Sequence, residues 1–67
     1  MEIYEYRIMM NLIRRDIIVN WGYVLANNVD DAVAKVRKEF PRYTASDSRY
    51  WVVAGKTNRE VLPVKIL

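Results

Sequence analysis

A strand-to-helix junction decides the fold of this chain: GYVLANNVDDA, residues 22–32. Its first half is rich in β-branched and aromatic residues, and it belongs to a strand expected from Ile17 to Ala26. The two asparagines that follow are favoured helix N-caps, and the two aspartates after them suit the positive end of a helix dipole. The sequence therefore predicts a strand that passes directly into a helix.

The predicted helix is amphipathic. Its apolar residues recur at three- and four-residue steps, which places them on one face of the cylinder. They are Val29, Ala32, Val33, Val36 and Phe40. Pro41 is expected to end the helix, because the residue before a proline is disfavoured in helical geometry. The segment from Arg42 to Ser48 is then expected to be a loop.

Three more strands complete the predicted sheet. Residues 2–10 alternate large and charged side chains, and they are expected to pair with the second strand as a hairpin across a polar break at Arg14–Asp16. Tyr50–Ala54 and Val61–Leu67 have the composition of the third and fourth strands. Pro63 indicates an edge position for the last one.

The whole chain, residues 1–67, is therefore predicted to be one α+β domain. It has a small antiparallel four-stranded sheet with one helix packed on one face, in the order β-β-α-β-β. One helix covers only part of one face, so the other face must meet water or another molecule. Strand alternation sends Tyr50 and Trp51 to opposite faces, which leaves aromatic groups uncovered. Gly22 indicates a bulge or the close approach of a bulky ring or another backbone.

The composition argues against catalysis. The 67 residues include no histidine and no cysteine, the side chains of most acid-base, nucleophilic and structural zinc chemistry. The only two glycines are too far apart for a phosphate-binding loop. Asp30 and Asp31 point about 100° apart on a helix, and Ser46-Asp47-Ser48 lacks a base. We expect a protein that is not an enzyme, with no metal site and no cofactor.

The sequence also bounds the location and the partners. No apolar run approaches the roughly 20 residues that span a bilayer, and the N-terminus lacks the pattern of a secretory signal. We therefore expect a cytoplasmic protein with no membrane partner. The net charge of +3 is common among small proteins and is weak evidence for a polyanionic partner.

Size and aromatic content favour a binding module that acts through protein–protein contacts. A chain of this length buries roughly 60% of its unfolded surface, and it has no disulfide to stabilise it. We expect a homodimer that uses an aromatic-rich sheet face, or a subunit or inhibitor of a larger assembly. The contact area is assigned to Trp21, Tyr23 and Trp51, with Tyr4 or Tyr6, and the polar rim to Arg14, Arg15, Arg42 and Arg49.

Single-stranded nucleic acid is the alternative partner. Bases stack on exposed rings while cations hold the phosphates, and this chain has both kinds of residue. The phosphate contacts assigned in that case are Lys35, Arg37, Lys38 and Arg42.

Overall fold

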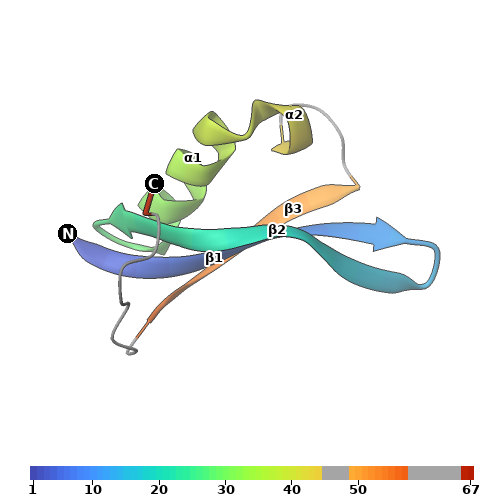
Figure 1. Ribbon diagram of the computed structural model, residues 1–67, viewed down its shortest axis with the longest axis horizontal. Helices are drawn as coiled ribbons and strands as arrows, with labels where there is room; N and C mark the ends of the chain where they lie inside the picture. Colours follow the sequence, from blue (N-terminus) through green and yellow to red (C-terminus); the bar gives the residue numbers. More distant parts are fainter. Residues whose placement is uncertain (45–48, 58–65) are drawn as a thin grey trace.

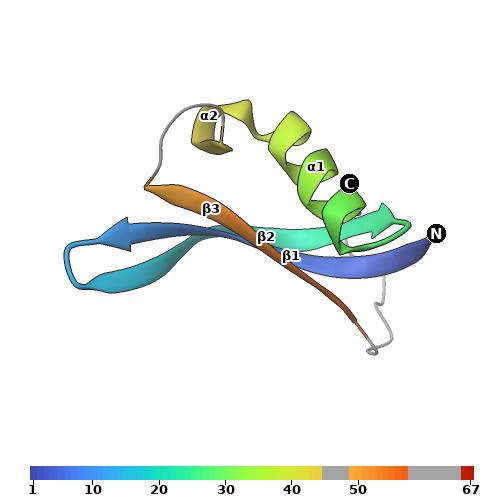
Figure 2. The same ribbon diagram turned by 180° about the vertical axis from the view of Figure 1, so that it is seen from behind.

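The structure is a computed structural model that describes residues 1–44, 49–57 and 66–67. It contains the strands β1 (Glu2–Leu12), β2 (Arg15–Ala26) and β3 (Tyr50–Lys56), the helix α1 (Val29–Glu39) and the single helical turn α2 (Pro41–Thr44). The strands form one antiparallel sheet in the order β2-β1-β3. Both helices lie on the same side of this sheet (Figures 1 and 2).

The predicted α+β class, the first three strands and the single long helix are confirmed. The fourth predicted strand is not shown, because residues 61–65 lie outside the described part of the chain. Pro63 and its expected edge position fall in that gap. At the described end of the segment, Ile66 forms an isolated parallel bridge with Tyr23 on the outer side of β2.

A two-residue turn, Ile13-Arg14, joins β1 to β2. Both turn residues have positive φ angles, 41° and 60°, although neither is glycine or asparagine. The polar break was expected at Arg14–Asp16, but only Arg14 lies in the turn, because Arg15 and Asp16 already pair with β1. β3 reaches only to Met10, so the hairpin extends beyond the rest of the sheet (Figure 1).

A β-bulge interrupts the alternation of β2. Ile8 pairs with Asn20, whereas the next residue, Met9, pairs with Ile18, so Val19 is the extra residue. Strict alternation along the sequence puts Ile18 and Trp21 on opposite faces. That expectation is wrong, because the bulge moves Ile18 to the face that carries Met9 and Trp21.

Two side-chain hydrogen bonds fix the start of α1 at the predicted junction. The Asn28 side-chain oxygen accepts from the Asp31 N–H at 2.8 Å, and the Asp31 carboxylate accepts from the Asn27 N–H at 2.9 Å. The Asn27 N–H lowers the pKa of the Asp31 carboxyl. The two aspartates thus support the helix, as their position in the sequence predicts.

The helix ends where the proline predicts, but the segment after it is not simply a loop. Phe40 has non-helical backbone angles, and its N–H donates to the Val36 carbonyl at 3.0 Å. Pro41 then opens the turn α2, so residues 42–44 are helical and not the loop that was expected, while residues 45–48 of that expected loop lie outside the described part of the chain. Proline is tolerated there because the first helical N–H has no intrahelical partner.

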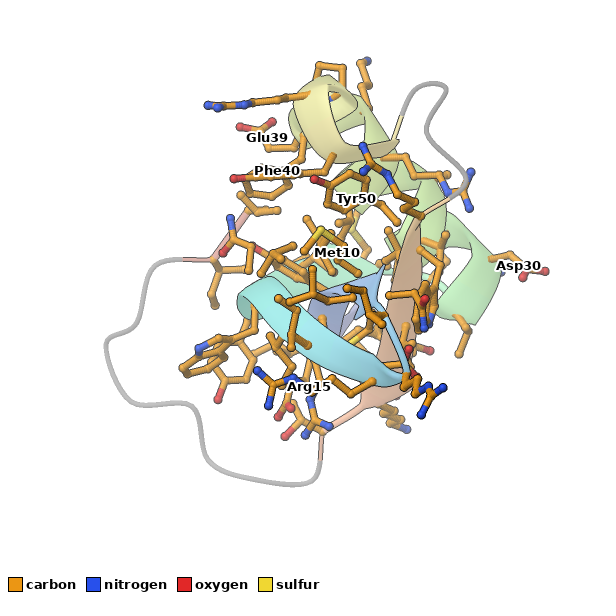
Figure 3. The ribbon with its side chains drawn as sticks, turned by 90° about the vertical axis from the view of Figure 1, so that its right-hand side faces the viewer. Met10, Arg15, Asp30, Glu39, Phe40 and Tyr50 are labelled. Carbon is orange, nitrogen blue, oxygen red and sulfur yellow. The ribbon has the colours of Figure 1, made fainter. Side chains whose placement is uncertain are left out.

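The core lies between α1 and one face of the sheet. Alternate residues of β1 supply its centre and meet the buried side of the helix. The buried residues are Tyr4, Tyr6, Ile8, Val24, Ala26, Ala32 and Val36. Met10 and Tyr50 continue this layer toward the hairpin, with Phe40 above them (Figure 3).

The Tyr6 ring lies directly over the backbone of Gly22 in this core. The two residues are register partners on β1 and β2, and a Cβ atom at Gly22 would lie 2.7 Å from the Tyr6 Oη and 3.0 Å from its Cζ. The same ring packs at 6.0 Å from the ring of Phe40. Burial raises the pKa of Tyr6, and the nearby Glu39 carboxylate adds to that rise. Of the two interpretations of Gly22, the approach of a bulky ring is correct.

We expect Gly22→Ala to lower the free energy of unfolding by about 1–3 kcal/mol, because the added methyl overlaps the Tyr6 ring. Urea denaturation followed by circular dichroism measures the change. Gly55→Ala is the matched control, since no atom lies within 4 Å of its Cβ position, and it should stay within about 0.5 kcal/mol of the wild type. Equal losses for the two variants would contradict the ring contact.

The double variant Ile13→Asn/Arg14→Gly should raise the free energy of unfolding by about 1–2 kcal/mol. Asparagine and glycine adopt positive φ readily, whereas a β-branched residue does so at a cost. The same urea titration tests this. Leu12→Asn, at a neighbouring strand position, should give no gain, and an unchanged double variant would show that the turn stores no strain.

Candidate interaction surface

The face of the sheet opposite α1 is the candidate site, and we call it the open face. No helix or strand of the described chain lies over it (Figures 1 and 2). The pairing registers and strand alternation assign thirteen residues to it. They are Ile3, Glu5, Arg7, Met9 and Asn11 from β1, Asp16, Ile18, Trp21, Tyr23 and Leu25 from β2, and Trp51, Val53 and Gly55 from β3.

Large apolar side chains on the open face are exposed. Trp21 is 59% exposed, Ile18 50% and Val53 49%. The rings of Trp21 and Tyr23 meet edge to face, with centroids 6.1 Å apart and an interplanar angle of 80°. Several exposed apolar residues gathered on one face mark an interaction site more often than scattered single residues do.

One ion pair lies at the centre of the open face. The Nε and Nη2 atoms of Arg7 donate to the Glu5 carboxylate at 3.3 and 3.1 Å. The same two residues, with Val53, Gly55 and Thr57, line a hollow of about 450 Å³ on the β3 side of the face. Nothing lies within 4 Å of the position that a Cβ of Gly55 would take, so the glycine leaves this hollow unfilled.

The structure brings three predicted contact residues together. Trp21, Tyr23 and Trp51 all lie on the open face. Tyr4 and Tyr6 do not, and this is a correction: both are buried beneath α1. Tyr4, Tyr6 and Ile8 are alternate residues of β1, so their side chains point to the same face, and α1 covers all three.

The predicted basic residues of the helices lie on the other side of the sheet. Lys35, Arg37 and Lys38 belong to α1 and Arg42 to α2. The Lys35 amine donates to the Leu25 carbonyl at 2.9 Å and pairs with Asp31 at 3.4 Å. Arg42 stacks over the Tyr43 ring at 5.9 Å. These four cations are therefore separated from the open face by the sheet itself.

The other three predicted arginines lie near the hairpin end of the sheet. Arg14 is in the turn, Arg15 begins β2, and Arg49 directly precedes β3. The Arg49 carbonyl accepts from the Asn11 N–H at 3.0 Å, which extends the ladder by one residue. All three side chains belong to exposed residues.

Of the residues on the open face, sequence reasoning named only Trp21, Tyr23 and Trp51, and Ile18, Val53 and Gly55 are among those that it missed. Ile18 was assigned to the opposite set, because a bulge leaves no clear signal in a β-branched run. Val53 lies two residues after Trp51 on the same strand, so the alternation of the sequence already places both on one face. Gly55 lies beyond the expected strand Tyr50–Ala54, but β3 continues through it to Lys56, and its missing side chain shapes the hollow.

The outer edge of β2 is less available than the open face. Three successive residues whose backbone groups point outward from this edge already have hydrogen-bond partners. The Leu25 carbonyl accepts from the Lys35 amine, and the Tyr23 carbonyl accepts from the Leu67 N–H at 2.9 Å. The Trp21 N–H donates to the Asn20 side-chain oxygen at 2.8 Å. Such contacts discourage the addition of another strand. The face rather than this edge is therefore the candidate for a partner.

Other kinds of site were sought over the same part of the chain. Within residues 1–44, 49–57 and 66–67, no group of three or more potential ligand side chains could hold a metal ion. None of the helices described is long and apolar enough to cross a membrane. Comparison of the chain with protein families, with curated proteins and with solved structures found no match.

Proposed function

We propose that this chain is a small non-catalytic binding module that acts by burying its open face in a protein–protein contact, and that its partner is a second copy of the chain. The observation that carries this proposal is the exposure of Trp21, Ile18 and Val53 together on one face of a three-stranded sheet. Water is an unfavourable neighbour for such a patch, and each Å² removed from water contributes about 25 cal/mol.

The chemistry of the face supports a protein partner. Interface cores are depleted in charge and enriched in tryptophan, tyrosine, methionine and arginine. The open face has this composition at its centre, since two of its three charged strand residues, Glu5 and Arg7, are paired with each other. The third, Asp16, lies toward the hairpin turn, where its carboxylate accepts from the Asn11 side chain at 3.0 Å. Trp21 is the residue best suited to anchor the contact, because large aromatic side chains dominate binding energy.

The size of the molecule also suits self-association. Its principal extents are 35 × 20 × 17 Å, so a whole sheet face has the order of the roughly 800 Å² that each partner buries in a standard interface. A two-fold dimer needs only one kind of patch, present on both copies. Self-association would also supply apolar contact that a chain of this length cannot make alone.

Sedimentation equilibrium in moderate salt, over a wide range of concentrations, tests this proposal. We expect a monomer–dimer equilibrium that Trp21→Ala weakens at least 30-fold, as is typical of a truncated anchor costing about 2 kcal/mol.

Two valines provide a matched pair of variants. Val53, on the open face, and Val29, at the start of α1, are 49% and 46% exposed. Val53→Ser should weaken the dimer about 5-fold, for a loss of about 1 kcal/mol, whereas Val29→Ser should leave it unchanged. A monomer at all concentrations, or equal effects of the two substitutions, would argue against the proposal.

Single-stranded nucleic acid is the second candidate, favoured by the exposed Trp21–Tyr23 pair as a stacking platform. Against it, the cations of α1 and α2 lie on the far side of the sheet from these rings. A fluorescence titration with single-stranded RNA tests this alternative. With about four phosphate contacts, affinity should fall roughly 50-fold between about 50 and 200 mM salt. Absent or salt-insensitive binding would remove this candidate.

A further inference from the structure

The open face has a high side and a low side. On β2, Trp21 and Tyr23 form what we call the ridge. On β3, Gly55 and its neighbours leave what we call the hollow, the volume of about 450 Å³ lined by Glu5, Arg7, Val53 and Thr57. The face is therefore uneven, and its two features lie on opposite sides of β1.

The ridge and the hollow lie at the same height along the strands. Tyr23, Glu5 and Gly55 are register partners in one row across the sheet, and Trp21, Arg7 and Val53 form the next such row. β1, the middle strand, lies midway between the ridge and the hollow. This placement gives the face an approximate self-complementarity.

A dimer whose two-fold axis runs parallel to β1 would match the ridge of each copy with the hollow of the other. Such an axis exchanges the β2 side of one copy with the β3 side of the other and keeps each row at its own height. The ridge of each copy then lies over the hollow of its partner, twice in one interface. Sheets packed in this way are about 10 Å apart with strand directions within about 30° of each other, a common arrangement of two sheets.

The hollow also has the chemistry to receive an aromatic side chain. The Arg7 guanidinium, held by Glu5 at 3.1 Å, offers a cation to the face of an indole or phenol ring. The Glu5 carboxylate can accept from an indole N–H or a phenol O–H. The axis sets Glu5 opposite Glu5 and Arg7 opposite Arg7 of the two copies. Because each Glu5 is paired with the Arg7 of its own copy, the four groups that meet at the axis have no net charge.

We propose that a second copy of this chain docks face to face, with the Trp21–Tyr23 ridge of each copy inserted into the Gly55 hollow of the other. This inference rests on the proposed function and specifies its geometry. It assigns Gly55 a role in binding, through the space that it leaves open, and gives the Glu5–Arg7 pair the role of lining the receiving surface.

Filling the hollow tests the geometry. Gly55→Leu should raise the dimer dissociation constant at least 30-fold in sedimentation equilibrium, while circular dichroism and the thermal midpoint stay those of a folded chain, since the added atoms enter open space. Ala34→Leu places the same side chain on an exposed position of α1 and is the control that should leave the dimer unchanged. Adding Tyr23→Ala to Gly55→Leu should restore part of the affinity, because the trimmed ridge makes room.

Cross-linking tests the pairing directly, and the natural absence of cysteine makes it clean. Tyr23→Cys and Gly55→Cys chains are mixed, allowed to exchange subunits and treated with a bis-maleimide cross-linker of about 10 Å span, which adds one cysteine thiol at each end. The mixture should cross-link faster than either variant alone, because each Tyr23 position faces the partner's Gly55 position.

The outcomes separate the two proposals. A dimer that tolerates Gly55→Leu, or that cross-links only between identical positions, overturns the ridge-in-hollow geometry and leaves the proposed dimer standing. A chain that is monomeric at every concentration overturns both. Loss of the dimer with Gly55→Leu, partial rescue by Tyr23→Ala and preferential mixed cross-links together support the geometry.

Discussion

The contact between the Tyr6 ring and the backbone of Gly22 governs the rest of the structure. Tyr6 and Gly22 are register partners on β1 and β2, and the Tyr6 ring also packs against the ring of Phe40 at the end of α1. A side chain at position 22 would occupy the space of the ring, so glycine allows the large aromatic residue to fill the core between the sheet and α1.

Once one face is covered, the properties of the other follow. On β1 and β3, the residues that alternate with the buried ones point to the open face, and no described segment covers them. The bulge at Val19 adds Ile18 to this face. A three-stranded sheet with one long helix therefore has an enclosed layer and an apolar layer open to contact. The same alternation that buries Tyr4 and Tyr6 leaves Trp21 and Trp51 on the open side.

The distribution of charge reinforces this division. The helix cations lie beyond the core, where Lys35 is engaged with Asp31 and with the Leu25 carbonyl at the edge of β2. The open face has a paired carboxylate and guanidinium at its centre. A surface of this kind favours an apolar and aromatic partner over a polyanion, and the proposed dimer is consistent with the separation.

The sequence by itself determined the elements whose signals are local. Asn28, Asp31 and Pro41 mark the ends of α1 through hydrogen bonds and backbone restrictions that involve only near neighbours, and β-branched and aromatic runs mark the first three strands. Alternation also requires that aromatic residues fall on both faces. Only the tertiary structure decided which rings were buried, since a period of two defines two faces without stating which one meets the helix. It also decided the place of Ile18, because a bulge depends on pairing with β1, and the role of Gly55, because a hollow exists only between strands that are distant in sequence.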